Sequence, residues 1–100
     1  MTERIIVEVD RELEDLIPLF RQTRERDIAG LAAGLASGDV AALRMIGHGM
    51  KGSGGAFGFP LITEMGDAIE AAALKSDYAT VSQQLELLRS YMARIDIKYV

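Results

Sequence analysis

Four stretches with helical periodicity, separated by turns of a few residues, constrain the fold of this chain more than any other feature. Ser37-Gly38-Asp39 supplies a helix stop and a new N-cap, Pro60 ends the second stretch, and Asp77 caps the last. The first stretch covers about residues 18–36. The second begins at 40, runs into the glycine cluster and stops by 59. The third covers about 61–75, and the fourth begins at 78 and keeps its apolar spacing as far as 95. Such short connections predict an all-α protein, an antiparallel up-and-down four-helix bundle.

The residues before the bundle carry weaker signals. Asp10 can cap a short extra N-terminal helical turn over residues 11–17, with Pro18 at the start of the next helix. Residues 5–9 look like a strand, but we find no second strand to pair with them. Residues 1–10 are therefore expected to be an extended lead-in on a single domain that covers residues 1–100. The opening Met and the four helices suggest a stand-alone protein, and a domain cut from a larger kinase is the alternative interpretation.

Composition excludes several classes of function. There is no Cys, which rules out disulfides, thiol nucleophiles and Cys-based metal sites. A net charge of −4 argues against nucleic acid or an anionic membrane surface as a partner. No apolar run is long enough to span a membrane, and no signal peptide opens the chain. We therefore expect a monomer in the cytoplasm, with no nucleic-acid or membrane partner.

The one histidine of the chain, His48, lies in a cluster of six glycines between positions 47 and 58. At about 100° per residue, the apolar side chains of this helix fall within about 40° of the side opposite His48. Those side chains are Leu43, Ile46, Met50 and Phe57. His48 should therefore point to solvent, with Arg44 one turn before it and Lys51 one turn after it on the same outer face.

The glycines around the histidine need a physical reason, because each glycine inside a helix costs about 1 kcal/mol relative to alanine. One reason is close helix packing, expected for Gly47, Gly49 and Gly54. The other is steric clearance, since Gly52 and Gly55 would let a protein and a bulky group approach the imidazole. An ammonium group three residues after the histidine suits a dianion on that ring. Together these features favour phosphoryl transfer.

The stretch His48-Gly49-Met50-Lys51-Gly52-Ser53-Gly54-Gly55-Ala56-Phe57-Gly58 resembles the signature of histidine-containing phosphotransfer (HPt) domains. These domains are four-helix bundles of phosphorelays and of chemotaxis-type histidine kinases. The resemblance extends back to the turn at 37–39 and forward, through Phe59 and Glu64, to Asp67 and Glu70. Gly47 and Gly49 depart from the pattern, because most members carry larger residues there. Met50 replaces the commoner Leu, a near-isosteric change.

The resemblance implies a phosphocarrier of a two-component phosphorelay. His48 would be the phosphoacceptor, attacking an aspartyl phosphate through Nε2 and passing the group to a receiver aspartate. Lys51 would stabilise the phosphoryl group, and Gly52 and Gly55 would give it and the receiver access. Arg44 would assist binding, or else be a solvated surface charge.

Attack through Nε2 requires the proton on Nδ1 of the imidazole. Glu70 matches the acidic position that accepts this hydrogen bond in chemotaxis-type members, and Asp67, one turn earlier, is its substitute. For either residue, a plain surface charge is the alternative interpretation.

The implied partners are response-regulator receiver domains and a histidine kinase, including a hybrid kinase. We expect no cofactor of the chain's own, with Mg²⁺ held by the receiver. The chain has no ATP-binding glycine boxes, so no autonomous ATP-dependent kinase activity is expected.

Two nucleotide-binding patterns compete with this interpretation and fail. Gly47-x-Gly49-x-x-Gly52 matches the dinucleotide fingerprint, with Asp67 twenty residues on, but that motif needs a strand before it. The phosphate-loop pattern fails because Lys51 precedes Gly52.

A metal site from His48, Asp67 and Glu70 would offer one nitrogen and two weakly specific carboxylates, so we expect none. The remaining alternative is a helical docking module that binds a receiver or another signalling protein without being phosphorylated.

Overall fold

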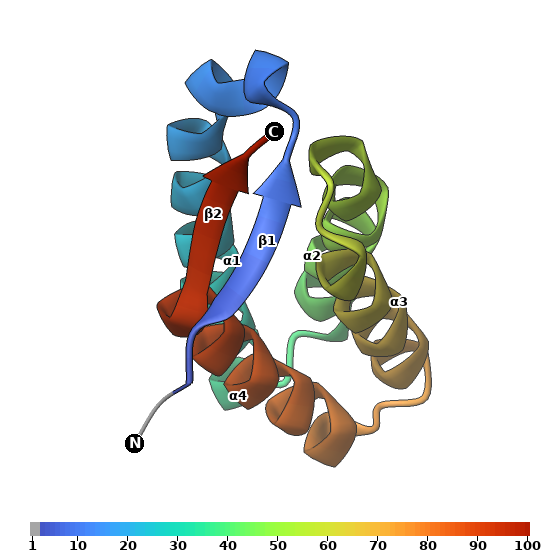
Figure 1. Cartoon of the computed structure of the whole chain (residues 1–100). Coiled ribbons are helices and arrows are strands. Elements are labelled where there is room, and N and C mark those ends of the chain that lie inside the picture. Colours follow the sequence, from blue (N-terminus) through green and yellow to red (C-terminus); the bar gives the residue numbers. More distant parts are fainter. Residues whose placement is uncertain (1–2) are drawn as a thin grey trace.

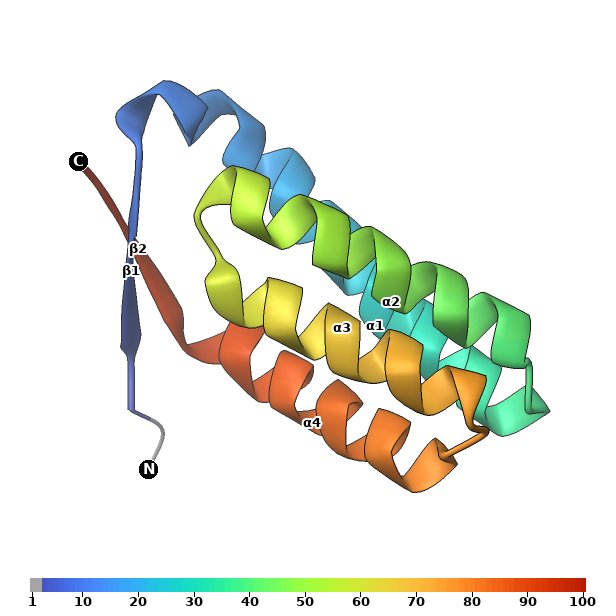
Figure 2. The ribbon, with the colours of Figure 1, turned by 90° about the vertical axis from the view of Figure 1, so that its right-hand side faces the viewer.

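The computed structural model describes residues 3–100, which form a mostly helical protein with four long helices (Figure 1). These are α1 (Ile17–Ser37), α2 (Val40–Gly54), α3 (Pro60–Leu74) and α4 (Tyr78–Arg94). Two 3₁₀ helices, η1 (Arg11–Leu16) and η2 (Gly55–Phe57), precede α1 and follow α2. Figure 2 shows the helices side by side, with the chain turning back between α1 and α2 and between α3 and α4 at one end of the bundle. The prediction of four helices in a bundle is confirmed.

The helix ends form where the local sequence signals stand. The Asp39 side chain accepts a hydrogen bond from the amide of Ala42 at 3.1 Å and so caps α2. Asp77 caps α4 in the same way through the amide of Thr80, also at 3.1 Å. Gly38 ends α1 in the left-handed region with a φ of 67°, a conformation that a side chain disfavours.

The core lies along the faces that the helices turn toward one another. Its fully buried side chains come from every long helix and from the connection before α3, so one apolar interior joins all four. The largest of them are Phe59, Leu31, Leu43, Met50, Ile62, Ile69 and Leu88. Phe59 stacks on Phe20 of α1, with the two ring centroids 4.3 Å apart.

The expectation that residues 5–9 have no strand partner is wrong. Strand β1 (Ile5–Val9) pairs in parallel with β2 (Ile95–Tyr99), with Ile5 opposite Ile95 and Val9 opposite Tyr99. The pair lies beside one end of the bundle and places the first and last strands of the described chain side by side (Figures 1 and 2).

The helical spacing of the apolar residues predicts that the last helix includes Ile95, and this prediction is wrong. Helix α4 ends at Arg94, and Ile95 is extended, with a ψ of 140°. Ile95 is 3% exposed, so it is buried whether the segment is counted as helix or as strand. Residues 95–99 alternate apolar and polar side chains, which is the period of a strand.

Candidate functional site

Helix α2 presents His48 to the solvent, as its apolar periodicity predicts. The His48 side chain is 77% exposed. Leu43 and Met50, on the other side of the helix, are fully buried against the bundle. The outward direction predicted for this imidazole is therefore confirmed.

Small residues let α2 and α3 approach to backbone contact beside His48. A Cβ added to Gly47 would lie 2.7 Å from the backbone nitrogen of Glu70 and 2.9 Å from the carbonyl oxygen of Gly66. A Cβ on Gly66 would clash with the backbone nitrogen of Lys51. Gly66 is not among the site residues predicted from the sequence. The sequence feature that could have indicated it is a glycine inside a helical stretch, one turn before Glu70.

The other glycines of the cluster divide between packing and clearance. A Cβ on Gly54 would lie 2.6 Å from the backbone nitrogen of Thr63, so Gly54 packs closely, as expected. Within residues 3–100, no atom beyond the local helix backbone lies within 4 Å of a Cβ built on Gly49 or on Gly52. The expectation of close packing for Gly49 is thus wrong, while Gly52 leaves open space beside Lys51. At Gly55 the added atom would meet Thr63 Oγ1 at an ordinary 3.7 Å.

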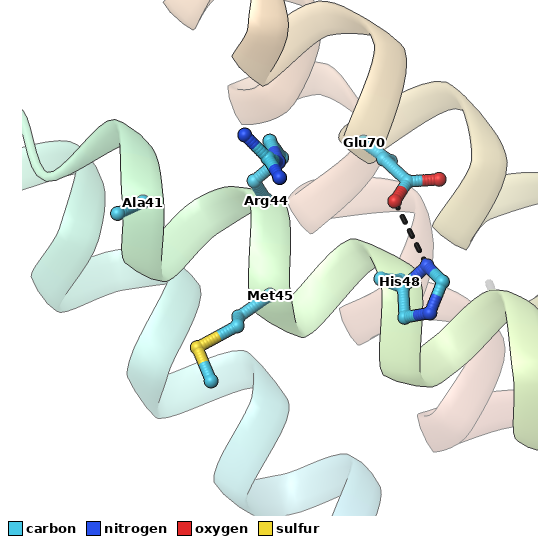
Figure 3. A pocket seen from close by; sticks show the side chains of 5 residues that line it. All are labelled: Ala41, Arg44, Met45, His48 and Glu70. Atoms are coloured by element: carbon cyan, nitrogen blue, oxygen red, sulfur yellow. Dashed lines mark hydrogen bonds and ion pairs between the residues drawn. The ribbon is translucent and has the colours of Figure 1, made fainter.

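The close crossing brings a carboxylate to the imidazole. Oε2 of Glu70 lies 2.9 Å from Nδ1 of His48, as the dashed line in Figure 3 marks. An ionised carboxylate can only accept, so Nδ1 carries the proton and donates. In the neutral ring this leaves Nε2 with its lone pair.

The second carboxylate contacts the lysine. Oδ1 of Asp67 lies 3.1 Å from Nζ of Lys51, and Oε1 of Glu70 lies 3.8 Å from the same nitrogen. The hydrogen bond from Lys51 to Asp67, together with the charges of Asp67 and Glu70, raises the pKa of Lys51. Asp67 therefore does not take the place predicted for it as a substitute on His48, which Glu70 occupies. The structure instead joins His48, Glu70, Lys51 and Asp67 in one chain of polar contacts.

A pocket of about 440 Å³ lies beside the imidazole. It is lined by Ala41, Arg44, Met45, His48 and Glu70 (Figure 3). Arg44 comes one turn before His48 on α2 and is exposed. Met45 presents an apolar side chain that is 76% exposed. The surface around the histidine thus combines an apolar contact area with a cation.

A buried arginine near this site was not anticipated. Arg24 of α1 is 3% exposed, and its Nε donates to Oδ2 of Asp27 at 2.8 Å. Its Nη1 donates to Oγ of Ser53 on α2 at 2.9 Å, and the guanidinium lies 5.0 Å from the ring centre of Phe20. Burial raises the pKa of Asp27, and the charge and hydrogen bond of Arg24 oppose this rise. The sequence signal that could have predicted its burial is the position of Arg24, one turn after Phe20 on the apolar face of α1.

Comparison with known families agrees with this site. The family model described as Hpt domain matches residues 15–97, nearly the whole chain. The chain belongs to the Hpt domain family, and it is accordingly a phosphotransfer module of phosphorelay signalling. No curated protein and no solved structure matches the chain significantly. Across residues 3–100, none of the helices is both long enough and apolar enough to cross a membrane.

Proposed function

We propose that His48 is the phosphoacceptor of this Hpt domain and that the protein carries phosphoryl groups between receiver aspartates in the cytoplasm. The observation that supports this most is the Glu70–His48 contact of 2.9 Å on an imidazole that is 77% exposed. It combines a fixed proton on Nδ1 with access of a partner to Nε2.

The transfer is a displacement at phosphorus. The lone pair on Nε2 forms the N–P bond while the bond between phosphorus and the receiver's aspartyl oxygen breaks, and that carboxylate leaves with its electron pair. Nδ1 keeps its proton, which Glu70 holds by the hydrogen bond. The reverse step returns the group to the same or another receiver aspartate. Such transfers depend mainly on positioning and charge stabilisation.

Two cationic side chains near His48 can stabilise the negative charge of the transferred phosphoryl group, and a glycine leaves space for the partner. Lys51 is 47% exposed and lies one turn after His48, so its flexible side chain can turn toward phosphoryl oxygens. The space left by Gly52 permits the approach of the receiver. Arg44, at the pocket rim, adds a second cation. Mg²⁺ belongs to the receiver partner in this scheme.

The test is phosphorylation of the purified chain by phosphorylated receiver domains and, without a protein partner, by phosphoramidate. Phosphoramidate transfers its phosphoryl group to Nε2 as its P–N bond breaks and ammonia leaves. We expect acid-labile, base-stable phosphate on the wild type and none on His48→Gln, with an unchanged circular dichroism spectrum. The matched control Arg89→Gln, at an exposed position of α4, should be labelled like the wild type.

The same experiment distinguishes the proposed phosphoacceptor from the alternative, a docking module that is not phosphorylated. Labelling that persists in His48→Gln would remove His48 from the mechanism. Receivers that bind the chain without labelling it, together with no reaction with phosphoramidate, would favour a docking module that is not phosphorylated.

A further inference from the structure

The ammonium of Lys51 already has partners when no phosphoryl group is present. Its Nζ lies 3.1 Å from Oδ1 of Asp67 and 3.8 Å from Oε1 of Glu70. The other oxygen of Glu70 holds Nδ1 of His48 at 2.9 Å. A phosphoryl group on His48 therefore arrives at a lysine that two carboxylates share.

The two carboxylates differ in how easily they can give up the lysine. The Glu70 side chain is 22% exposed and is tied to His48. The Asp67 side chain is 64% exposed, and its only contact among the described ion pairs is with Lys51. An exposed carboxylate can exchange such a pair for water at little cost. Asp67 is thus the partner that Lys51 can exchange.

The incoming group competes for the same cation. A phosphoryl group carries about two negative charges near neutral pH and several strong acceptor oxygens. Lys51 cannot bond fully to these oxygens while Asp67 holds it at 3.1 Å. The negative charge of Asp67 also disfavours a second anion at the lysine.

We infer that Asp67 is a positioning residue that holds Lys51 in the unphosphorylated protein and yields it to the phosphoryl group, which makes phosphorylation of His48 less favourable. This inference rests on the proposed function, because it assigns Asp67 a role in the reaction at His48. Asp67 acts through Lys51 and does not touch the reacting atoms.

The test is a double-mutant cycle with phosphoramidate as the donor, followed by ³¹P NMR of phospho-His48. Asp67→Asn should raise the rate constant of phosphorylation about two- to five-fold, the range expected for an exposed ion pair. Lys51→Ala should lower it, and Asp67→Asn should give no further gain in the Lys51→Ala background. Asp67→Glu, which keeps the carboxylate, should stay near the wild-type rate.

Two further measurements separate this role from a general effect of charge or structure. Glu64→Gln removes one negative charge from the same helix, one turn before Asp67, and should leave the rate unchanged. The pKa of Lys51, followed by NMR, should fall toward its usual value in Asp67→Asn and stay in place in Glu64→Gln.

Each outcome is decisive. Absence of phospho-His48 in the wild type, with phosphorylated receivers as well as with phosphoramidate, would overturn the proposed function and this inference with it. Phosphorylation of His48 with an unchanged rate in Asp67→Asn would overturn the inference alone. An equal gain with and without Lys51 would do the same, because it would show direct repulsion rather than competition for the lysine.

Discussion

Glu70 of α3 reaches His48 of α2 across a helix crossing that glycines make possible, with Oε2 at 2.9 Å from Nδ1. The contact selects the tautomer in which Nε2 has the lone pair. It therefore connects the packing of two helices to the choice of the nitrogen that reacts.

Removal of the Glu70 carboxylate should slow phosphorylation and change its site. In Glu70→Ala, Nδ1 loses its acceptor, so both tautomers are populated. We expect a rate constant with phosphoramidate about five-fold lower, in line with the net value of one hydrogen bond, and some phosphate on Nδ1. Nitrogen-15 and ³¹P NMR of the histidine measure both effects. Glu70→Gln, whose amide oxygen can still accept, should restore part of the rate. A wild-type tautomer in Glu70→Ala would contradict the assignment.

Alanine at two glycines only two residues apart should have opposite effects on stability. A Cβ at Gly49 meets open space, so Gly49→Ala should raise the free energy of unfolding by about 0.5–1 kcal/mol, the difference in helix propensity. A Cβ at Gly47 would lie 2.7 Å from the Glu70 backbone nitrogen, so Gly47→Ala should lower it by about 1–3 kcal/mol. Urea denaturation measures both changes. Equal effects of the two variants would contradict the close crossing of α2 and α3.

The open space at Gly52 should matter to a protein partner and not to a small donor. Gly52→Leu adds a side chain where no neighbouring atom lies within 4 Å in the described chain, so the fold should tolerate it. We expect transfer from a phosphorylated receiver to fall at least ten-fold, a change of about 1.4 kcal/mol in the barrier, while phosphorylation by phosphoramidate stays within about two-fold. Gly49→Leu is the matched variant on the same helix. Equal loss with both donors would indicate disturbance of the imidazole itself.

The helices and the direction of His48 could be predicted because their causes are local. The caps at Asp39 and Asp77 each bond to an amide three residues on. The outward direction of His48 follows from the apolar residues on the same helix. The strand pair could not be found in this way, since β1 and β2 lie at opposite ends of the chain and Ile95 satisfies both periods.

The site was predictable in its residues, and the family resemblance gave Glu70 as the partner of His48, with Asp67 as its substitute. The residues alone could not choose between these two carboxylates, because both lie on the same side of one helix and the distance between α2 and α3 decides which of them meets His48. That distance depends on Gly66, whose missing side chain has an effect only when the facing helix is known. Arg24 was missed because a charged residue on an apolar face is usually expected at the surface.

The partly buried Arg24–Asp27 pair should make the free energy of unfolding depend on pH when the pair is broken. Burial holds the pKa of Asp27 above its usual value in the folded chain, although Arg24 opposes this. The folded state therefore binds the Asp27 proton more tightly than the unfolded state, and stability falls as pH rises through the raised pKa. In Arg24→Met the opposing charge is gone, so this pKa should rise further. We expect a loss of about 1–3 kcal/mol at pH 7, below the range for a fully buried pair because the Asp27 side chain is 15% exposed, and a smaller loss at pH 4, close to the usual pKa of the carboxyl group. Urea denaturation at both values measures this, and Arg24→Met with Asp27→Asn should recover much of the loss at pH 7. A loss of equal size at both pH values would show that Arg24 acts by packing against Phe20 rather than by compensating Asp27.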